Sequence, residues 1–284
     1  MIRYIPSRFV ILLLLLLISA AIKAQTIEVQ PLTKPLIVDG LNDDWPDIPT
    51  IKINLRKTNS NNYQHVTHVL LKSGIYGGSI YFFIEWDDDS YNNIHKPWVW
   101  DSQQSKYTKG PQREDRLAIQ FGMEGDYTND WLSGKSFKAD TWHWKASRSN
   151  PIGLVHDKST IISSRKILRS AKFKSRDGND VYIARPSDAG DKLYKTKRYR
   201  KYVDNIMPKY ILAQNPQGSV ADIKGKGIWK NGRWSLEIQR KLNTHHDDDV
   251  RFPADGGTVI GAIAVFNASD NEDHSISDIL SFEF

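Results

Sequence analysis

Short runs of alternating apolar and polar residues recur along this 284-residue chain, and helical periodicity is almost absent. Asp115–Phe121, which reads DRLAIQF, is the clearest of these runs. Gly227–Arg240 predicts a hairpin around the turn Asn231-Gly232. No linker rich in proline, glycine or serine divides the chain. The pattern predicts an all-β protein, an antiparallel β-sandwich with long loops and one or two short helices.

The segment Phe137–Gly153 reads FKADTWHWKASRSNPIG and concentrates the unusual side chains. In an extended strand Trp142 and Trp144 face one way, and His143 and Lys145 face the other, because side chains alternate with a period of two. Two large indoles on one face need either a packed core or a flat ligand to cover them. The segment is therefore the first candidate for a binding site.

Cysteine is absent, which excludes disulfides, zinc–thiolate sites, iron–sulfur clusters, thiol nucleophiles and the covalent attachment of a c-type haem. Nine tryptophans favour strands, ring-lined pockets or both. The chain contains no zinc-protease, nucleophile-elbow or phosphate-loop motif. The sequence thus predicts a carrier or binding module and no catalytic site.

The first two dozen residues are typical of a secretory signal. Arg3 and Arg8 form a basic start, Phe9–Ile22 is apolar, and Ala24-Gln25 is a suitable cleavage point. A retained membrane anchor is the alternative, but the apolar run is short for a bilayer span. We expect a signal peptide over 1–24, a single domain over 25–284, a periplasmic or secreted location, and no stable membrane span after signal removal.

The formal net charge of +6 is uneven, because the segment 165–209 carries most of the excess lysine and arginine. Binding to nucleic acid is not expected of an exported protein. A solvated basic surface is one interpretation of this basic excursion. A docking face for an acidic redox partner or an anionic surface is the other.

Candidate metal ligands are scattered. The acidic runs Asp87–Asp89 and Asp247–Asp249 fall at predicted strand ends or turns, and oxygen-rich turns of this kind are one way to hold calcium. Aspartate also forms turns without any metal. Met123 follows a strand between two glycines, where its thioether is either presented to a ligand or packed as a core filler. His274 lies in a polar loop before the last strand.

Six landmarks follow one another in a recognisable order: Asp39-Gly40 with Trp45; IYFFIEWDD with Trp86; DRLAIQF with Met123 after it; ADTWHWKASRSNPIG; GRWSLEIQRKL; and AVFNASDNEDHSISDILSFEF. This order resembles the haem-binding domain of ethylbenzene dehydrogenase gamma subunits and related cytochromes, the haem b carriers of complex-iron–sulfur molybdoenzymes. The resemblance covers roughly Ile37–Phe284, without the basic excursion.

The resemblance implies a β-sandwich that holds one non-covalent haem b and transfers single electrons to a redox partner such as a molybdoenzyme or cytochrome. In the family a methionine and a lysine hold the iron, and Met123 falls at the methionine position. This chain has no lysine after Lys241, so His274 is the nearest competent second ligand. Lys145 and His143 are the fallback ligands. Trp142 and Trp144 would contact the haem ring, and Lys145 or Arg148 would pair with its propionates.

Two other classes of function stay open. The Asp39-Gly40 start and the abundant aromatics are also similar to family-nine carbohydrate-binding modules, in which tryptophans stack on sugar rings and calcium stabilises the fold. Trp98 and Trp100, in the polar loop 92–110, would then form the sugar platform with Trp131 and Trp142. An adhesion or scaffold sandwich without a ligand is the third alternative.

Overall fold

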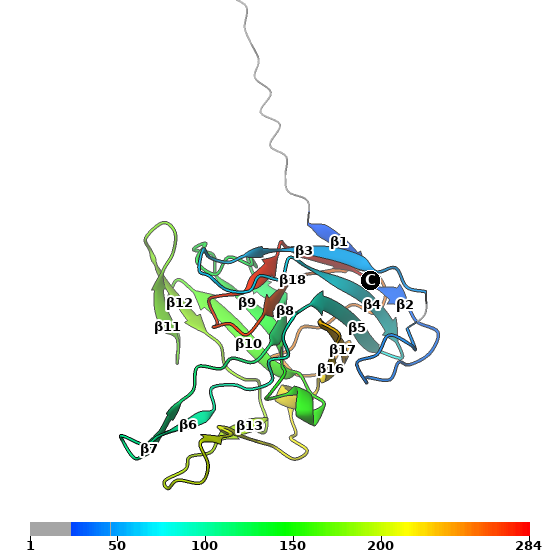
Figure 1. Cartoon of the computed structure of the whole chain (residues 1–284). Coiled ribbons are helices and arrows are strands. Elements are labelled where there is room, and N and C mark those ends of the chain that lie inside the picture. The colour runs from blue at the N-terminus through cyan, green and yellow to red at the C-terminus, as the bar shows by residue number, and fades with distance from the viewer. Residues whose placement is uncertain (1–23, 46) are drawn as a thin grey trace, which may run out of the picture.

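A computed structural model describes residues 24–45 and 47–284, which form two packed layers of β-strands (Figure 1). The expected signal peptide lies almost entirely outside these residues. Within the described part of the chain, no helix has the length and apolar character needed to cross a membrane. The predicted antiparallel β-sandwich is confirmed, and the expected short helices are two 3₁₀ turns, η1 (Asn150–Ile152) and η2 (Ser219–Ala221).

The first layer is built around the strand that contains the two neighbouring tryptophans. In spatial order its strands are β11 (Ala171–Lys174), β12 (Asp180–Ala184), β10 (His156–Ser163), β9 (Phe137–Lys145), β8 (Arg116–Gly125), β18 (Thr258–Phe266) and β19 (Ser275–Ser277). β18 also pairs with β20 (Leu280–Glu283), and β20 pairs in parallel with β1 (Gln25–Glu28). The first described strand therefore lies beside the last.

The second layer continues from the first through the pairing of β19 with β3. Its strands are β3 (Ile51–Lys57), β4 (His68–Tyr76), β5 (Ser79–Asp87), β17 (Arg233–Lys241) and β16 (Lys224–Lys230), with β2 (Gln30–Pro31) beside β4. Two small sheets complete the structure: β13 (Tyr194–Thr196) with β15 (Tyr210–Leu212), and β14 (Ile206–Met207) with β6 (Trp98–Asp101) and β7 (Lys106–Lys109). The β6–β7 hairpin and β13 project away from the sandwich (Figure 1).

The β16–β17 hairpin follows directly from its turn residues. Asn231 and Gly232 have φ angles of 53° and 75°, the left-handed pair that a two-residue hairpin turn of type I′ requires. The register across the turn pairs Trp229 with Trp234. The hairpin predicted from the sequence is confirmed, and it fixes which residues of β17 face the interior.

Aromatic rings from both layers fill the space between the sheets. Phe82 on β5 packs edge-on against Trp142 on β9, with ring centroids 5.9 Å apart. Trp86 on β5 packs in the same way against Trp144 on β9, again at 5.9 Å. Edge-to-face pairs at this separation are favourable beyond the apolar area that they bury. This ridge of rings holds the two layers together.

Candidate functional site

The strand β9 presents its side chains as the sequence predicted, with Trp142 and Trp144 facing the second layer. Both indoles are completely buried, and both belong to the main hydrophobic core. Trp142 contacts Phe121, and Trp144 contacts Trp234, with ring centroids 4.9 Å apart in each pair. The cover that these indoles require is therefore the opposite sheet, and no face of either ring is left for a haem or a sugar.

The opposite face of β9 is also closed, by side chains that pair with one another. Lys145 Nζ lies 2.7 Å from Nδ1 of His156, and burial lowers the pKa of Lys145 well below its usual value. Arg148 forms an ion pair with Glu114, which is itself fully buried. His143 is half-buried, with its ring centroid 5.7 Å from that of Phe266. The cations proposed to bind haem propionates are thus already engaged by the protein.

Met123 and His274, the predicted pair of iron ligands, lie far apart. Met123 sits at a bulge near the end of β8 and packs against the core between the layers. His274 stacks on Phe266 with ring centroids 4.7 Å apart, and Phe266 pairs with Arg116 at the start of β8. Seven residues of β8 separate the two places, a distance of roughly 20 Å at the rise of an extended strand.

The two side chains also occupy opposite faces of the first layer. On β18 the residue next to Phe266, Val265, points into the core, so Phe266 and the His274 ring that covers it lie on the outer face. Met123 is on the inner face. One iron cannot be ligated from both positions, so the Met123–His274 pair does not fit a haem in this structure.

The tryptophans suggested as a sugar platform are not assembled into one either. Trp142 is in the core, and Trp131 lies under the Arg185 guanidinium at 5.6 Å. Trp98 and Trp100 are on β6, where the Trp98 indole nitrogen donates to the carbonyl of Lys197 at 2.6 Å. The expectation of a platform formed by all four is wrong, because they belong to separate parts of the fold.

The structure instead reveals a buried cluster of acidic side chains around Arg240 of β17. Asp140 of β9, Asp157 of β10 and Asp249, in the loop between β17 and β18, are all buried and lie around the guanidinium. Arg240 Nη1 is 2.6 Å from Asp140 Oδ2, 4.0 Å from Asp157 Oδ2 and 3.9 Å from Asp249 Oδ1. We call these three carboxylates the acidic cluster.

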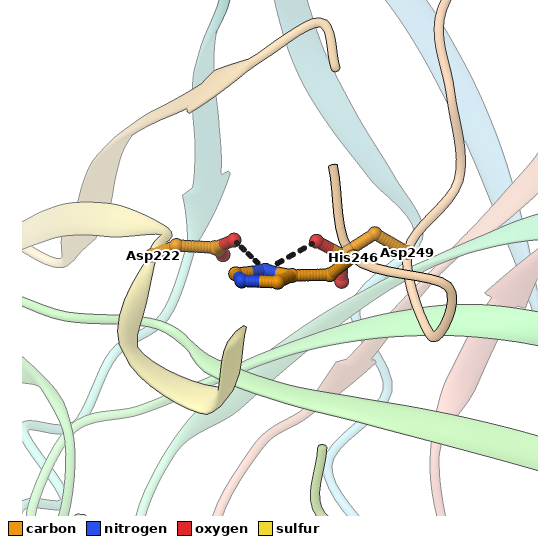
Figure 2. A group of neighbouring side chains, drawn as sticks. All are labelled: Asp222, His246 and Asp249. Atoms are coloured by element: carbon orange, nitrogen blue, oxygen red, sulfur yellow. Dashed lines mark hydrogen bonds and ion pairs between the residues drawn. The ribbon is translucent and has the colours of Figure 1, made fainter. Parts of the chain in front are cut away.

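At one side the acidic cluster meets a more exposed group of ligating atoms. Asp222, at the end of η2, and His246 converge on Asp249 (Figure 2). His246 Nδ1 lies 3.3 Å from Asp222 Oδ2 and 3.5 Å from Asp249 Oδ2. The side chains of Asp222 and His246 are 22% and 42% exposed, whereas that of Asp249 is fully buried. This group is the partly exposed edge of the acidic cluster.

Burial dominates the acid–base properties of these carboxyl groups. It raises the pKa of Asp140 and Asp157, and the pKa of Asp222 rises to about 7 from burial and the neighbouring charge of Asp249. Asp188, whose Oδ1 accepts a hydrogen bond from Ser159, also has its pKa raised to about 7 by burial. More negative charge is concentrated here than the single Arg240 neutralises.

Sequence reasoning identified only one member of the cluster, Asp249, as part of the run Asp247–Asp249. The alternation of side chains along the strands could have identified two of the missed residues, Asp140 and Arg240. Asp140 and Trp142 are two residues apart in β9, so their side chains point to the same face of the sheet. The same holds for Ile238 and Arg240 in β17. A charged residue at a core-facing position of each of two strands indicates a buried ion pair.

The structure is a β-sandwich whose interior is filled by aromatic and aliphatic side chains. Residues 42–277 match the family model described as ethylbenzene dehydrogenase. The chain belongs to this family, as the order of landmarks predicted. It is a family of electron-transfer subunits, which agrees with the prediction of a protein that is not itself a catalyst.

No curated protein matches the sequence. Among solved structures, the fold is similar to a carbohydrate-binding module of family 9 from Caldicellulosiruptor kristjanssonii in complex with glucose (11% identity, 91% of this chain and 95% of that chain, TM-score 0.39). It is also similar to a protein from Bacteroides uniformis described as carbohydrate-binding (10% identity, 92% of this chain and 100% of that chain, TM-score 0.41).

Proposed function

We propose that the protein is an exported electron-transfer subunit, periplasmic or secreted, that carries non-covalent haem b and serves a redox partner such as a molybdoenzyme or cytochrome. The observation that carries the proposal is the family match over residues 42–277, which spans most of the sandwich. When bound, haem b supplies one-electron oxidation and reduction. The family relationship supports this function, and the geometry limits which residues are able to serve it.

Met123 is the iron ligand that we retain. The register of β8 with β9 shifts between Gly122 and Glu124, so Met123 stands in a bulge at the end of the strand, half-buried. Bulges re-aim side chains at strand ends and beside functional sites. His274 is excluded as its partner by the distance along β8, and Lys145 by its contact with His156. We therefore assign no second ligand and derive no electron path.

An absorption spectrum of the purified protein with added haemin, oxidised and then reduced with dithionite, tests the proposal. A sharp Soret band with resolved alpha and beta bands on reduction is expected. Met123→Leu should weaken these bands, and His274→Phe, the matched control, should leave them unchanged. A featureless wild-type spectrum overturns haem binding. Loss of the bands in His274→Phe alone would overturn the assignment of Met123.

The basic excursion supports docking to an acidic partner. Its exposed cations on β13 and close to either end of it are Lys192, Lys195, Lys197, Arg198, Arg200 and Lys201. One of them, Lys197, lies beside the projecting β6–β7 hairpin, since its carbonyl accepts a hydrogen bond from the Trp98 indole of β6 at 2.6 Å. Clustered surface charge of one sign accelerates association with an oppositely charged partner and loses its effect at high salt. We expect partner binding to weaken as ionic strength rises.

A further inference from the structure

We propose that the acidic cluster of Asp140, Asp157 and Asp249 binds one divalent cation, Ca²⁺, between the two layers of the sandwich. The three carboxylates come from β9, β10 and the loop after β17. One ligand oxygen from each lies within 4.8 Å of the others. Oxygens around a single Ca²⁺ lie at about 2.3–2.6 Å from the ion, so pairs of them are at most about 5 Å apart. The spacing therefore suits one ion.

The charge balance calls for a cation of two charges. Arg240 is the only lysine or arginine of the described residues that forms ion pairs with the three carboxylates, and it neutralises one of them. All three carboxylates are buried, and when all three are ionised two negative charges are left without a counter-charge. Buried charges without counter-charges are strongly unfavourable, and a divalent ion removes the whole excess.

Two buried oxygen atoms point independently to a missing partner. Asp140 Oδ1 and Asp157 Oδ2 accept no hydrogen bond, although both side chains are fully buried. Asp140 Oδ2, in contrast, accepts from the Trp142 indole, from Arg240 and from the amide of Val250. Asp157 Oδ2 faces the same Arg240 nitrogen as Asp249 Oδ1, so it points into the cluster. Buried polar atoms without partners are rare in folded proteins, and a bound cation would satisfy these two.

The donor atoms select the kind of ion. The cluster offers only carboxylate oxygens, which hard cations prefer, and Ca²⁺ accepts irregular coordination by six to eight oxygens more readily than Mg²⁺ does. Asp188, whose Oδ2 is also buried without a partner, lies beside the cluster and is a further oxygen donor. Asp222 and His246 lie beside Asp249 (Figure 2) and are partly exposed, so an ion would enter from their side.

The proposal is tested on residues 25–284. The protein is first treated with EGTA to remove bound Ca²⁺, and the binding of Ca²⁺ is then measured. We expect equilibrium dialysis against Ca²⁺ to recover one ion per chain. The melting temperature should rise by roughly 5–10 °C at a hundredfold excess over Kd. Mg²⁺ should give a much smaller shift. Asp157→Asn should abolish the Ca²⁺-dependent shift, and Asp89→Asn, an exposed aspartate in the other acidic run, should retain it.

A second measurement is independent of melting. Tb³⁺, a luminescent substitute for Ca²⁺, should show emission sensitised by tryptophan, because the Trp142 indole donates to Asp140 at 3.1 Å. Ca²⁺ should displace it, and Asp157→Asn should lack the signal. The competing explanation is that shared protons neutralise the carboxylates. A wild-type protein that binds neither ion near pH 7, and whose melting temperature rises only on acidification, overturns the cation site.

Discussion

The indole of Trp144 on β9 packs edge-on against that of Trp234 on β17, at 74° and 4.9 Å between ring centroids. Gly227 of β16 lies against the same Trp144 ring, and a Cβ at this glycine would stand 2.5 Å from Cζ2 of the indole. The two layers approach closely here only because one strand carries no side chain at this point.

Gly227→Ala should therefore destabilise the sandwich by about 1–3 kcal/mol, since the added methyl overpacks a fully buried ring. Urea denaturation followed by tryptophan fluorescence measures the change. Combining it with Trp144→Phe, which shortens the ring, should give a double mutant more stable than the sum of the single effects predicts. Strict additivity would contradict the proposed steric cause.

The buried pair of Asp140 and Arg240 gives a second prediction. Arg240→Met removes the only guanidinium within the acidic cluster and should cost about 3–5 kcal/mol, because it leaves buried carboxylates unpaired. Arg233, on the same strand as Arg240, forms an exposed ion pair with Asp87 of β5, so Arg233→Met should cost less than about 1 kcal/mol. Chemical denaturation of both variants makes the comparison. Equal losses would show that burial of the pair is unimportant.

The loop that contains Asp39, Gly40 and Trp45 is held by Glu237 of β17. The backbone N–H groups of Asp39 and Gly40 donate to Oε2 at 2.8 and 2.7 Å, and the Trp45 indole donates to Oε1 at 2.7 Å. Glu237→Gln places an amide N–H₂ opposite at least one of these donors, so stability should fall by about 1–3 kcal/mol. Thermal unfolding measures the loss, and the exposed Glu283→Gln should be neutral.

Acid should destabilise the fold partly through His274. Burial lowers its pKa to about 4 from an ordinary value of 6.5, so the unfolded chain binds this proton more readily. The contribution to stability is intact above pH 6.5 and is lost as the pH falls toward 4, by up to about 3 kcal/mol. His274→Asn keeps a donor for the Asn271 carbonyl without this titration. Its stability should depend less steeply on pH in that window, and an unchanged slope would refute the assignment.

Most of the fold could be predicted from the sequence because its signals are local. Alternation identified the strand that contains Trp142 and Trp144, and Asn231-Gly232 identified the hairpin of β16 and β17. The same alternation could not decide between a core and a ligand as the cover for the indoles. Burial decides it: both rings lie against the opposite sheet.

The candidate sites were harder to predict, because they depend on register and layer. The family resemblance paired Met123 with His274, yet the two lie apart along β8 and on opposite faces of the first layer. Conversely, Asp140, Asp157 and Asp249 are far apart in the sequence and converge only when β9, β10 and β17 are assembled. Neither the separation of the first pair nor the convergence of the three aspartates can be read from a short segment of the sequence.

The parallel pairing of β1 with β20 sets the order of assembly. Gln25 lies beside Leu280 and Glu28 beside Glu283, so two segments separated by almost the whole chain form one edge of the first layer. Contacts of such long sequence separation form late and slow folding, because the intervening chain must first lose its freedom. While the chain is still emerging from a ribosome or a translocation channel, β1 is available before β20, the strand with which it pairs. Until the final residues are available, the backbone N–H and C=O groups of β1 have no partner strand and are able to pair with a strand of another chain.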